Sequence, residues 1–181
     1  MATTAVRPAT PQDVAEIIRI QRAVWRAAYT ELLPPAAFDA IDSDEAEQAW
    51  LHTVRHGPAT VLVASEGEWT VGFCAAGPAP DAELAAANGS LPADSASTGL
   101  VSTLLVEPRW GRRGHGGRLL AAAAQALREL GAVRAVAWVP ELDAALLGFY
   151  RRVGWEPDGT VRTLDADGRQ LRELRMTGPL T

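Results

Sequence analysis

The sequence feature that most constrains this chain is a strand, a loop rich in glycine and arginine, and a helix that follow one another directly. Residues 100–106 are a run of β-branched and apolar residues that predicts a strand, and leucines and alanines at helical spacing then continue as far as Gly131. Between them, residues 109–118 contain four arginines, four glycines and one histidine. Glycines let successive backbone N–H groups point at one spot, and a helix N-terminus adds partial positive charge. The segment therefore predicts a binding site for a phosphate group.

The rest of the chain divides into short helices and strands, with no linker of domain length between them. Helices are expected at residues 11–25, 43–57, 118–130 and 143–153, and strands at residues 4–7, 60–64, 69–76, 100–106, 133–139, 160–164 and 171–177. Residues 78–99 lack periodicity and are expected to form a long loop with a short helical turn at residues 81–87. Hairpins combined with two crossovers predict an α/β fold around a central, partly antiparallel sheet.

Composition excludes several classes of protein. The net charge of −5 disfavours a nucleic-acid binder, and no run of about 18 uncharged apolar residues is present that could span a membrane. All 17 basic side chains are arginine, which excludes lysine Schiff-base chemistry and a phosphate-binding loop that ends in Gly-Lys. The single cysteine, Cys74, cannot form an internal disulfide, and this favours a cytoplasmic setting. His52 and His56 have no evident third ligand, so no metal site is expected.

The glycine-rich loop and its preceding strand carry a family resemblance. The strand ends in Val106-Glu-Pro108, and residues 110–120 read Trp-Gly-Arg-Arg-Gly-His-Gly-Gly-Arg-Leu-Leu. This stretch resembles the acetyl-coenzyme A (acetyl-CoA) motif of the Gcn5-related N-acetyltransferases (GNAT), which reads Q/R-x-x-G-x-G/A after a strand ending in Val-x-Pro. Gly114 and Gly116 occupy the two small positions, whereas Gly111 stands where the family has Gln or Arg.

The resemblance covers most of the chain and implies a fold. Residues 138–155, which include Phe149-Tyr150, are similar to the second half of the same family, and residues 25–34 look like its N-terminal helices. Residues 1–181 are therefore expected to form one N-acetyltransferase domain with an α/β fold. Its central sheet is expected to be mixed but mostly antiparallel, with about six to seven strands and about four flanking helices. The resemblance also implies that the sheet splays between its fourth and fifth strands.

The resemblance implies acetyl-CoA as the co-substrate, bound in the gap where the sheet splays. Exposed backbone of the fourth strand would bind the pantetheine arm, and the glycine-rich loop would bind the pyrophosphate. Asp143 stands where many relatives have Asn, and Asp also suits the N-cap of the helix that follows. The cofactor-binding residues implied in this way are Leu104, Leu105, Val106, Gly111, Arg112, Arg113, Gly114, His115, Gly116, Gly117, Asp143 and Tyr150.

The resemblance also implies catalytic roles. In the family, the position of Tyr150 is usually that of the general acid near the thioester sulfur, and packing on the last helix is its alternative role here. Trp138 stands where some relatives carry a glutamate that acts as the base, so the general base is left open between Glu107, Glu31 and a water relay. Tyr29 and Glu31 lie in a segment that borders the acceptor site in the family, and both are candidates for substrate contacts.

Together these residues predict an N-acetyltransferase that moves an acetyl group from acetyl-CoA to a primary amine of a small molecule or peptide, by direct attack in a ternary complex. The alternative is an acyl-CoA-binding sensor without turnover, which Gly111 and the missing strand glutamate favour. The expected partners are acetyl-CoA and an amine acceptor, with neither nucleic acid nor membrane. The sequence leaves open the acceptor, the general base, a homodimer, the role of residues 78–99 and the length of the acyl group.

Overall fold

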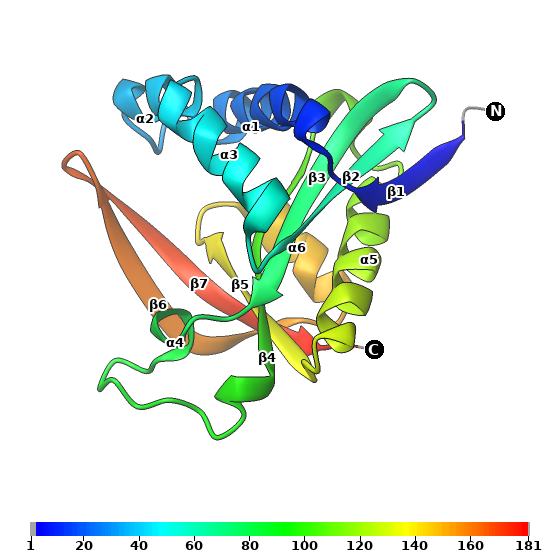
Figure 1. The fold of residues 1–181 in the computed structure, drawn as a ribbon. Coiled ribbons are helices and arrows are strands. Elements are labelled where there is room, and N and C mark those ends of the chain that lie inside the picture. The colour runs from blue at the N-terminus through cyan, green and yellow to red at the C-terminus, as the bar shows by residue number, and fades with distance from the viewer. Residues whose placement is uncertain (1–2, 181) are drawn as a thin grey trace.

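The computed structural model describes residues 3–180, which form one seven-stranded sheet with helices on both faces (Figure 1). The predicted domain also includes Met1, Ala2 and Thr181, which lie outside the described residues. The order across the sheet is β1-β2-β3-β4-β5-β7-β6. Neighbouring strands are antiparallel except for β4 and β5, so the predicted mixed, mostly antiparallel sheet is confirmed. The strands are β1 (Thr4–Pro8), β2 (Thr60–Glu66), β3 (Trp69–Pro78), β4 (Thr98–Val106), β5 (Arg134–Pro140), β6 (Glu156–Ala166) and β7 (Arg169–Pro179).

Two groups of helices bury opposite faces of the sheet. The helices are α1 (Val14–Ala28), α2 (Pro35–Ile41), α3 (Asp44–His56), α4 (Asp81–Leu84), α5 (His115–Glu129) and α6 (Ala144–Arg152). On one face, Ile17 and Ile20 of α1 pack with Phe73 of β3, and on the other, Leu119 of α5 packs in a cluster with Cys74. None of the described helices is long and apolar enough to cross a bilayer.

The described residues contain more helices than the sequence predicts. The helix α2 is one that the sequence does not predict: α1 ends at Ala28, and α2 begins at Pro35. Proline suits the first turn of a helix, where its missing N–H has no partner to lose and its fixed φ is already helical. The single turn of α4 lies within residues 81–87, where the sequence predicts a short helical turn in the long loop.

The sheet splays between β4 and β5, as the resemblance implies. The two strands pair only from Thr98↔Arg134 to Leu100↔Val136, whereas β5 pairs with β7 along its whole length. The register between β3 and β4 shifts at Ala75, which leaves Ser102 of β4 as the extra residue of a bulge. Because a β-bulge bends its strand and disturbs the ladder, β4 leaves β5 just beyond the last pair. The edge of β4 that follows has no strand partner among the described residues on that side.

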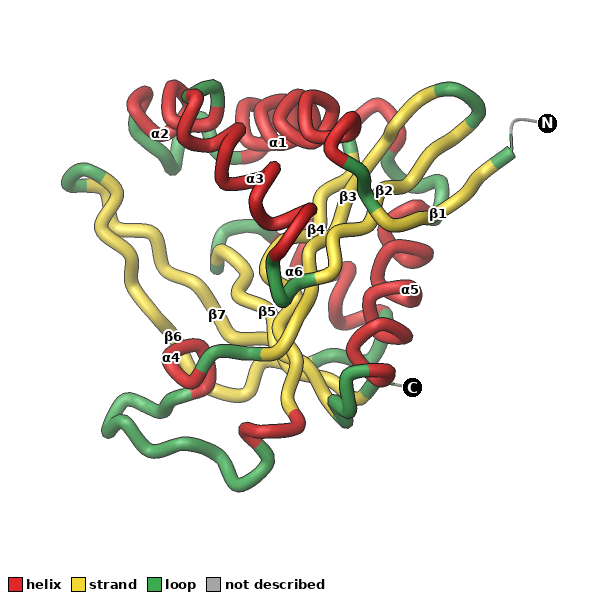
Figure 2. Tube along the Cα trace, viewed as in Figure 1, coloured by secondary structure: helices red, strands yellow, loops and turns green. Residues whose placement is uncertain are grey.

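The long loop between β3 and β4 is fastened to the far strands by arginines. Arg134 of β5 makes two hydrogen bonds to Asp94, at 2.5 and 2.9 Å. Arg162 of β6 binds Glu83 of α4 at 2.8 Å, and Arg175 of β7 donates to the carbonyls of Glu83 and Leu84. The loop therefore lies at the end of the sheet opposite α1 and α2 (Figures 1 and 2).

Strands β6 and β7 form a long hairpin that extends past the rest of the sheet toward α2 (Figure 1). The turn between them contains Asp167 at φ 54° and Gly168 at φ 81°. Positive φ at both central residues is what a two-residue turn of the primed type requires, and Asp-Gly is a favoured pair for it. The predicted hairpin is thus present, with longer strands than its sequence pattern indicates.

Candidate active site

A cleft opens where β4 and β5 diverge and runs to the N-terminus of α5. This interstrand cleft has a volume of about 460 Å³. Its walls come from β4, the loop after β4, the first turn of α5, one side of α6 along its length, and the end of α1. The lining residues are Val24, Ala28, Tyr29, Leu104, Leu105, Val106, Trp110, Gly111, Arg112, Gly114, His115, Gly116, Gly117, Asp143, Ala145, Leu146, Phe149 and Arg152.

The loop after β4 turns sharply into α5. Arg112 and Gly114 have φ values of 62° and 83°, and Gly114 is the N-cap of the helix. Its left-handed conformation favours glycine, because a Cβ would be strained there. The backbone N–H groups of the first helical turn have no partner within the helix, and the residues that carry them, 115–117, line the interstrand cleft. This is the arrangement that binds phosphate.

Two predicted phosphate ligands direct their side chains elsewhere. Nη1 of Arg113 lies 2.9 Å from one carboxylate oxygen of Glu66, and Nε2 of His115 lies 2.8 Å from the other. These hydrogen bonds, that of His115 first, lower the pKa of Glu66. Arg113 is absent from the lining of the interstrand cleft, so the prediction that its side chain holds pyrophosphate needs correction. Glu66 instead ties the loop to the end of β2, and His115 contributes its backbone to the cleft.

Several lining residues were not predicted as cofactor ligands, among them Trp110, Phe149 and Arg152. Trp110 lies beside the guanidinium of Arg113, whose central carbon is 5.0 Å from the centre of its ring. Phe149 faces the glycine-rich loop, since a Cβ added at Gly116 would lie only 3.3 Å from its ring. Arg152, near the end of α6, brings a charged side chain to the same cleft. The Phe149 and Arg152 positions recur at helical spacing on α6, but their contact with the loop depends on tertiary packing.

A hydrogen bond links α1 to α6 at the inner end of the cleft. Asp143 is the N-cap of α6, and its Oδ1 accepts from the N–H of Leu146 at 2.9 Å. Its Oδ2 accepts from the hydroxyl of Tyr29 at 2.7 Å. Burial, and then the hydrogen bond to Asp143, raises the pKa of Tyr29 above its usual range, so this hydroxyl stays a neutral donor. The predicted role of Asp143 as a helix cap is confirmed, and the residue also lines the interstrand cleft, whereas its role in cofactor binding stays a prediction.

A second cavity of about 500 Å³ lies on the other side of this hydrogen bond, between α1, α2 and the β6–β7 hairpin. This α1 cavity shares Tyr29, Leu104, Leu105 and Leu146 with the interstrand cleft. No described residue of the 78–99 loop lines either one. The two cavities therefore meet at Leu104 and Leu105, on the edge of β4 that lacks a strand partner.

Tyr150 lines the α1 cavity while most of its side chain is buried. The residue is 2% exposed, and its ring packs between Phe149 and Trp155, with ring centres 5.4 and 5.1 Å away. The packing role predicted for Tyr150 is thus present, and its role as a general acid near the thioester sulfur stays a prediction. Burial raises the pKa of Tyr150 above its usual range, which makes it a poorer acid and leaves it a hydrogen-bond donor.

Glu173 of β7 is a carboxylate in the α1 cavity that the sequence interpretation missed. It is 8% exposed, and one of its oxygens lies 2.5 Å from Nε of Arg162. It pairs with Pro140 of β5, and the β4–β5 register continued from Leu100↔Val136 puts Pro140 level with Leu104. Glu173 thus lies across the splay from the strand edge where the two cavities meet. Only the pairing of β5 with β7 brings it there, and nothing local in the sequence reveals that pairing.

Both glutamates proposed as bases from the sequence lie outside the two cavities. The carboxylate of Glu107 is bound on both sides, by Arg19 at 3.0 Å and by Arg109 at 2.8 Å, and it lines neither cavity. It therefore joins α1 to the loop after β4, a structural position. Glu31 is exposed, and its backbone carbonyl accepts from Arg169. The geometry supports neither as a base, nor Glu31 as a substrate contact, whereas Tyr29 borders both cavities.

Other reactive groups are placed away from catalysis. Cys74 is buried in the core on β3, and burial raises the pKa of its thiol to about 12. Its thiolate is thus a negligible fraction at neutral pH, which disfavours it as a nucleophile. Among residues 3–180, no group of three or more His, Cys, Asp or Glu side chains is arranged to hold a metal ion.

Comparison with known proteins agrees with this architecture. A model of the acetyltransferase (GNAT) family matches residues 18–155. PaiA N-acetyltransferase from Thermoplasma acidophilum, solved in complex with coenzyme A, superposes with a TM-score of 0.74 at 15% identity, covering 98% of this chain and 99% of that one. YncA, a putative acetyltransferase from Salmonella typhimurium solved with acetyl-CoA, gives 0.71 at 19% identity, covering 98% and 94%.

A third similar structure is the ribosomal-protein-alanine N-acetyltransferase from Brucella melitensis, with a TM-score of 0.72 at 22% identity, covering 97% of this chain and 99% of that one. No curated protein sequence matches the chain. The structural matches share the fold, and the family model spans well over half of the sequence, including β4, the glycine-rich loop and α6. The chain therefore belongs to the acetyltransferase (GNAT) family.

Proposed function

We propose that this protein transfers an acetyl group from acetyl-CoA to the nitrogen of a primary amine, either a small molecule or a peptide. The observation that carries the proposal is the unpaired edge of β4, which leads directly to the N-terminus of α5 inside one cleft. A pantetheine arm offers amide groups at intervals, so it can complete the hydrogen bonding of a strand edge. Two similar structures, those of PaiA and YncA, were solved with coenzyme A or acetyl-CoA.

The donor is proposed to lie along the whole interstrand cleft. Leu104, Leu105 and Val106 bind the pantetheine amides through their backbone, and the N–H groups of residues 114–117 bind the pyrophosphate. Arg112 and Arg152 supply positive charge from two sides of the cleft. The thioester then lies near Leu104, at the opening into the α1 cavity. This arrangement does not need the glutamine or arginine that the family motif has at the position of Gly111, since backbone N–H groups make most of the hydrogen bonds to the pyrophosphate.

The acceptor amine is proposed to enter through the α1 cavity and to lose its proton to Glu173. An amine with a pKa near 10.4 is mostly protonated at pH 7, and freeing its lone pair costs about 4–5 kcal/mol. A carboxylate that is held in the same cavity, directly or through one water, lowers that cost by receiving the proton. Arg162 donates from Nε to one oxygen of the Glu173 carboxylate and fixes its orientation, and the other oxygen accepts no hydrogen bond from the described residues.

Transfer is proposed to be direct, with no acyl-enzyme. The amine nitrogen attacks the thioester carbon, the carbon–sulfur bond breaks, and the sulfur leaves as a thiolate that then takes up a proton. Tyr150 stabilises that thiolate by donating a hydrogen bond, because full proton transfer from a phenol to a thiolate near pKa 8.5 is uphill, the more so when burial raises the phenol pKa. The high pKa of the Cys74 thiol, about 12, speaks against a covalent route through this residue.

Turnover with a panel of amines tests the proposal. The protein is incubated with acetyl-CoA and each of several alkylamines, arylalkylamines, polyamines and peptides, and free thiol and acetylated amine are both quantified. Thiol release that is matched by N-acetylated product supports the proposal. Tight CoA binding without thiol release across the panel would instead favour the second candidate, an acyl-CoA-binding sensor that lacks turnover, for which Gly111 in the motif is the specific observation.

A further inference from the structure

A third cavity lies beneath α1, α2 and α3 and continues from the α1 cavity. This helix groove has a volume of about 570 Å³. It shares Gln21, Trp25, Ala37 and Ser102 with the α1 cavity, so the two spaces are continuous past the bulge of β4. The groove therefore begins where the proposed acceptor site ends, and it leads away from the thioester under the helices.

The groove is apolar and is kept open by small side chains. Half of its lining is alanine, namely Ala37, Ala40, Ala46, Ala49, Ala59 and Ala75. Trp25, Ile41 and Trp50 supply the larger apolar surfaces, and none of the lining residues carries a charge. Helices that pack on a sheet normally fill such a space with larger side chains, because interiors are close-packed. The alanines of α2, α3, β3 and the loop before β2 thus leave a volume free beside the proposed acceptor site.

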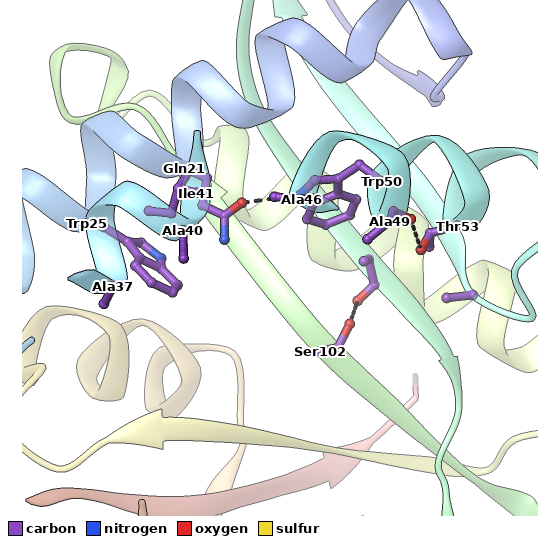
Figure 3. A pocket seen from close by; sticks show the side chains of 12 residues that line it. Gln21, Trp25, Ala37, Ala40, Ile41, Ala46, Ala49, Trp50, Thr53 and Ser102 are labelled. Atoms are coloured by element: carbon purple, nitrogen blue, oxygen red, sulfur yellow. Dashed lines mark hydrogen bonds between the residues drawn. The ribbon is translucent and has the colours of Figure 1, made fainter. Parts of the chain in front are cut away.

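The few polar groups of the groove are already satisfied or held in place. Figure 3 shows Oε1 of Gln21 joined to the indole N–H of Trp50, a hydrogen bond of 3.2 Å. It also shows the hydroxyl of Ser102 turned to the carbonyl of Ala75, at 3.2 Å, and that of Thr53 to the carbonyl of Ala49, at 2.9 Å. A charged group brought into the groove would meet no counter-ion, and an apolar chain would displace water without breaking these bonds.

We infer that the helix groove binds an uncharged apolar tail of the acceptor, so that the preferred substrate is a primary amine with an aliphatic or aromatic extension. This inference rests on the proposed function, because the amine end lies in the α1 cavity near Glu173. The carboxylate selects the amine head, and the charge-free groove selects the tail. A diamine or polyamine of the same length would have to strip water from its second ammonium, which makes it a poorer substrate.

The test is a series of unbranched alkylamines from ethylamine to octylamine, with the diamine of the same chain length as octylamine as a comparison. Each buried methylene contributes about 0.8 kcal/mol, so kcat/KM is expected to rise about fourfold per methylene until the groove is full. The diamine is expected to fall well below octylamine. A flat profile, or a diamine as good as octylamine, would overturn the inference while leaving acetyl transfer itself supported. If no amine is acetylated although CoA binds, the proposed function fails as well.

A matched pair of variants on α3 locates the effect. Ala46→Leu places a larger side chain in the groove, whereas Gln48→Leu makes a similar change on the same helix at an exposed position that does not line it. Ala46→Leu is expected to lower kcat/KM for octylamine about tenfold and to leave that for ethylamine within about twofold. Gln48→Leu is expected to match the wild type with both amines. Equal behaviour of the two variants with octylamine would contradict the assignment of the groove.

Discussion

The hydroxyl of Tyr29, at the end of α1, donates a hydrogen bond of 2.7 Å to the carboxylate of Asp143, which caps α6. The helix α1 packs in one hydrophobic cluster of the protein and α6 in the other, so this bond joins elements that belong to different parts of the core. Tyr29 lines both the interstrand cleft and the α1 cavity. The bond therefore stands at the boundary between the proposed donor and acceptor sites.

Removing either partner of this bond is expected to destabilise the fold, and the two losses should not add. Tyr29→Phe removes a hydrogen bond to a charged group, and Asp143→Ala removes the same bond together with the helix cap, worth about 1 kcal/mol. The double variant should be less destabilised than the sum by about 1 kcal/mol, measured by urea denaturation. Additivity within about 0.3 kcal/mol would mean that the hydroxyl and the carboxylate do not interact.

Asp13 should make stability fall in acid. Its carboxylate accepts from two nitrogens of Arg7, both at 2.8 Å, and from the N–H and hydroxyl of Thr10, at 2.7 and 2.9 Å. These bonds, that of Arg7 first, lower its pKa from 3.8 to about 2. Because the folded pKa is the lower one, the stabilisation is complete above about pH 4 and is lost as the pH falls toward 2.

The comparison for Asp13 is the variant Asp13→Asn, which cannot titrate. Between about pH 4 and pH 2, the wild type should lose roughly 2 kcal/mol more of its free energy of unfolding than the variant does. Denaturant midpoints measured at several pH values in that window check this. Parallel curves for the two proteins would show that Asp13 titrates normally in the folded state.

Two glycines with left-handed backbone conformation lie at the ends of α5, and substituting each one distinguishes an effect on CoA binding from an effect on stability. Gly114 at the N-terminus has φ 83° and Gly131 just beyond the C-terminus has φ 87°. Alanine at either position is expected to cost about 1–2 kcal/mol of stability, because an L-residue is strained there. Of the two glycines, only Gly114 lines the interstrand cleft. Gly114→Ala alone should therefore also weaken CoA binding, by about tenfold, because the backbone N–H groups at the start of α5 would shift.

Calorimetric titration of both glycine variants with CoA provides the measurement, with Gly131→Ala as the control for the loss of stability. The Kd of Gly131→Ala should stay close to the wild-type value. If both variants bind CoA equally well, the N-terminus of α5 is not the phosphate site.

Glu173→Gln tests the proposed base. Glutamine has a similar size and still offers an oxygen to Arg162, but it cannot take up a proton at neutral pH. The variant is expected to lose about 10²-fold in kcat, with little change in the Kd for CoA. The loss should be smaller for acceptor amines of lower pKa, since more of each is already deprotonated. A kcat within about twofold of the wild type for all amines would remove Glu173 from the chemistry.

The parts of the site that are contiguous in sequence could be predicted. The strand that ends at Val106, the turn at Gly114 and the start of α5 follow from local pattern and from backbone geometry that glycine allows. The splay between β4 and β5 followed from the family resemblance and not from the pattern itself. Its physical cause here, the bulge at Ser102, is a property of pairing with β3 and has no clear mark in the sequence.

The parts that depend on distant pairing could not be predicted. Glu66 is 49 residues from His115 in sequence, yet it accepts a hydrogen bond from that side chain and so turns it away from the proposed phosphate site. Glu107 is adjacent to the motif and looked available, but Arg19 of α1 reaches it in the folded chain. Glu173 enters the α1 cavity only because β7 inserts between β5 and β6. Closeness to a motif in the sequence thus does not show that a carboxylate lies close to the reacting atoms in the folded protein.

Hydrogen exchange of the backbone amides with and without CoA tests the central claim most directly. Within residues 3–180, the edge of β4 beyond Leu100 has no strand partner on the β5 side, and the N–H groups at the start of α5 have no helical acceptor. CoA is predicted to slow exchange within residues 104–106 and 114–117, and to leave the β6–β7 hairpin unchanged. If saturating CoA slows exchange in other segments and leaves it unchanged in residues 104–106 and 114–117, the proposed donor site is wrong.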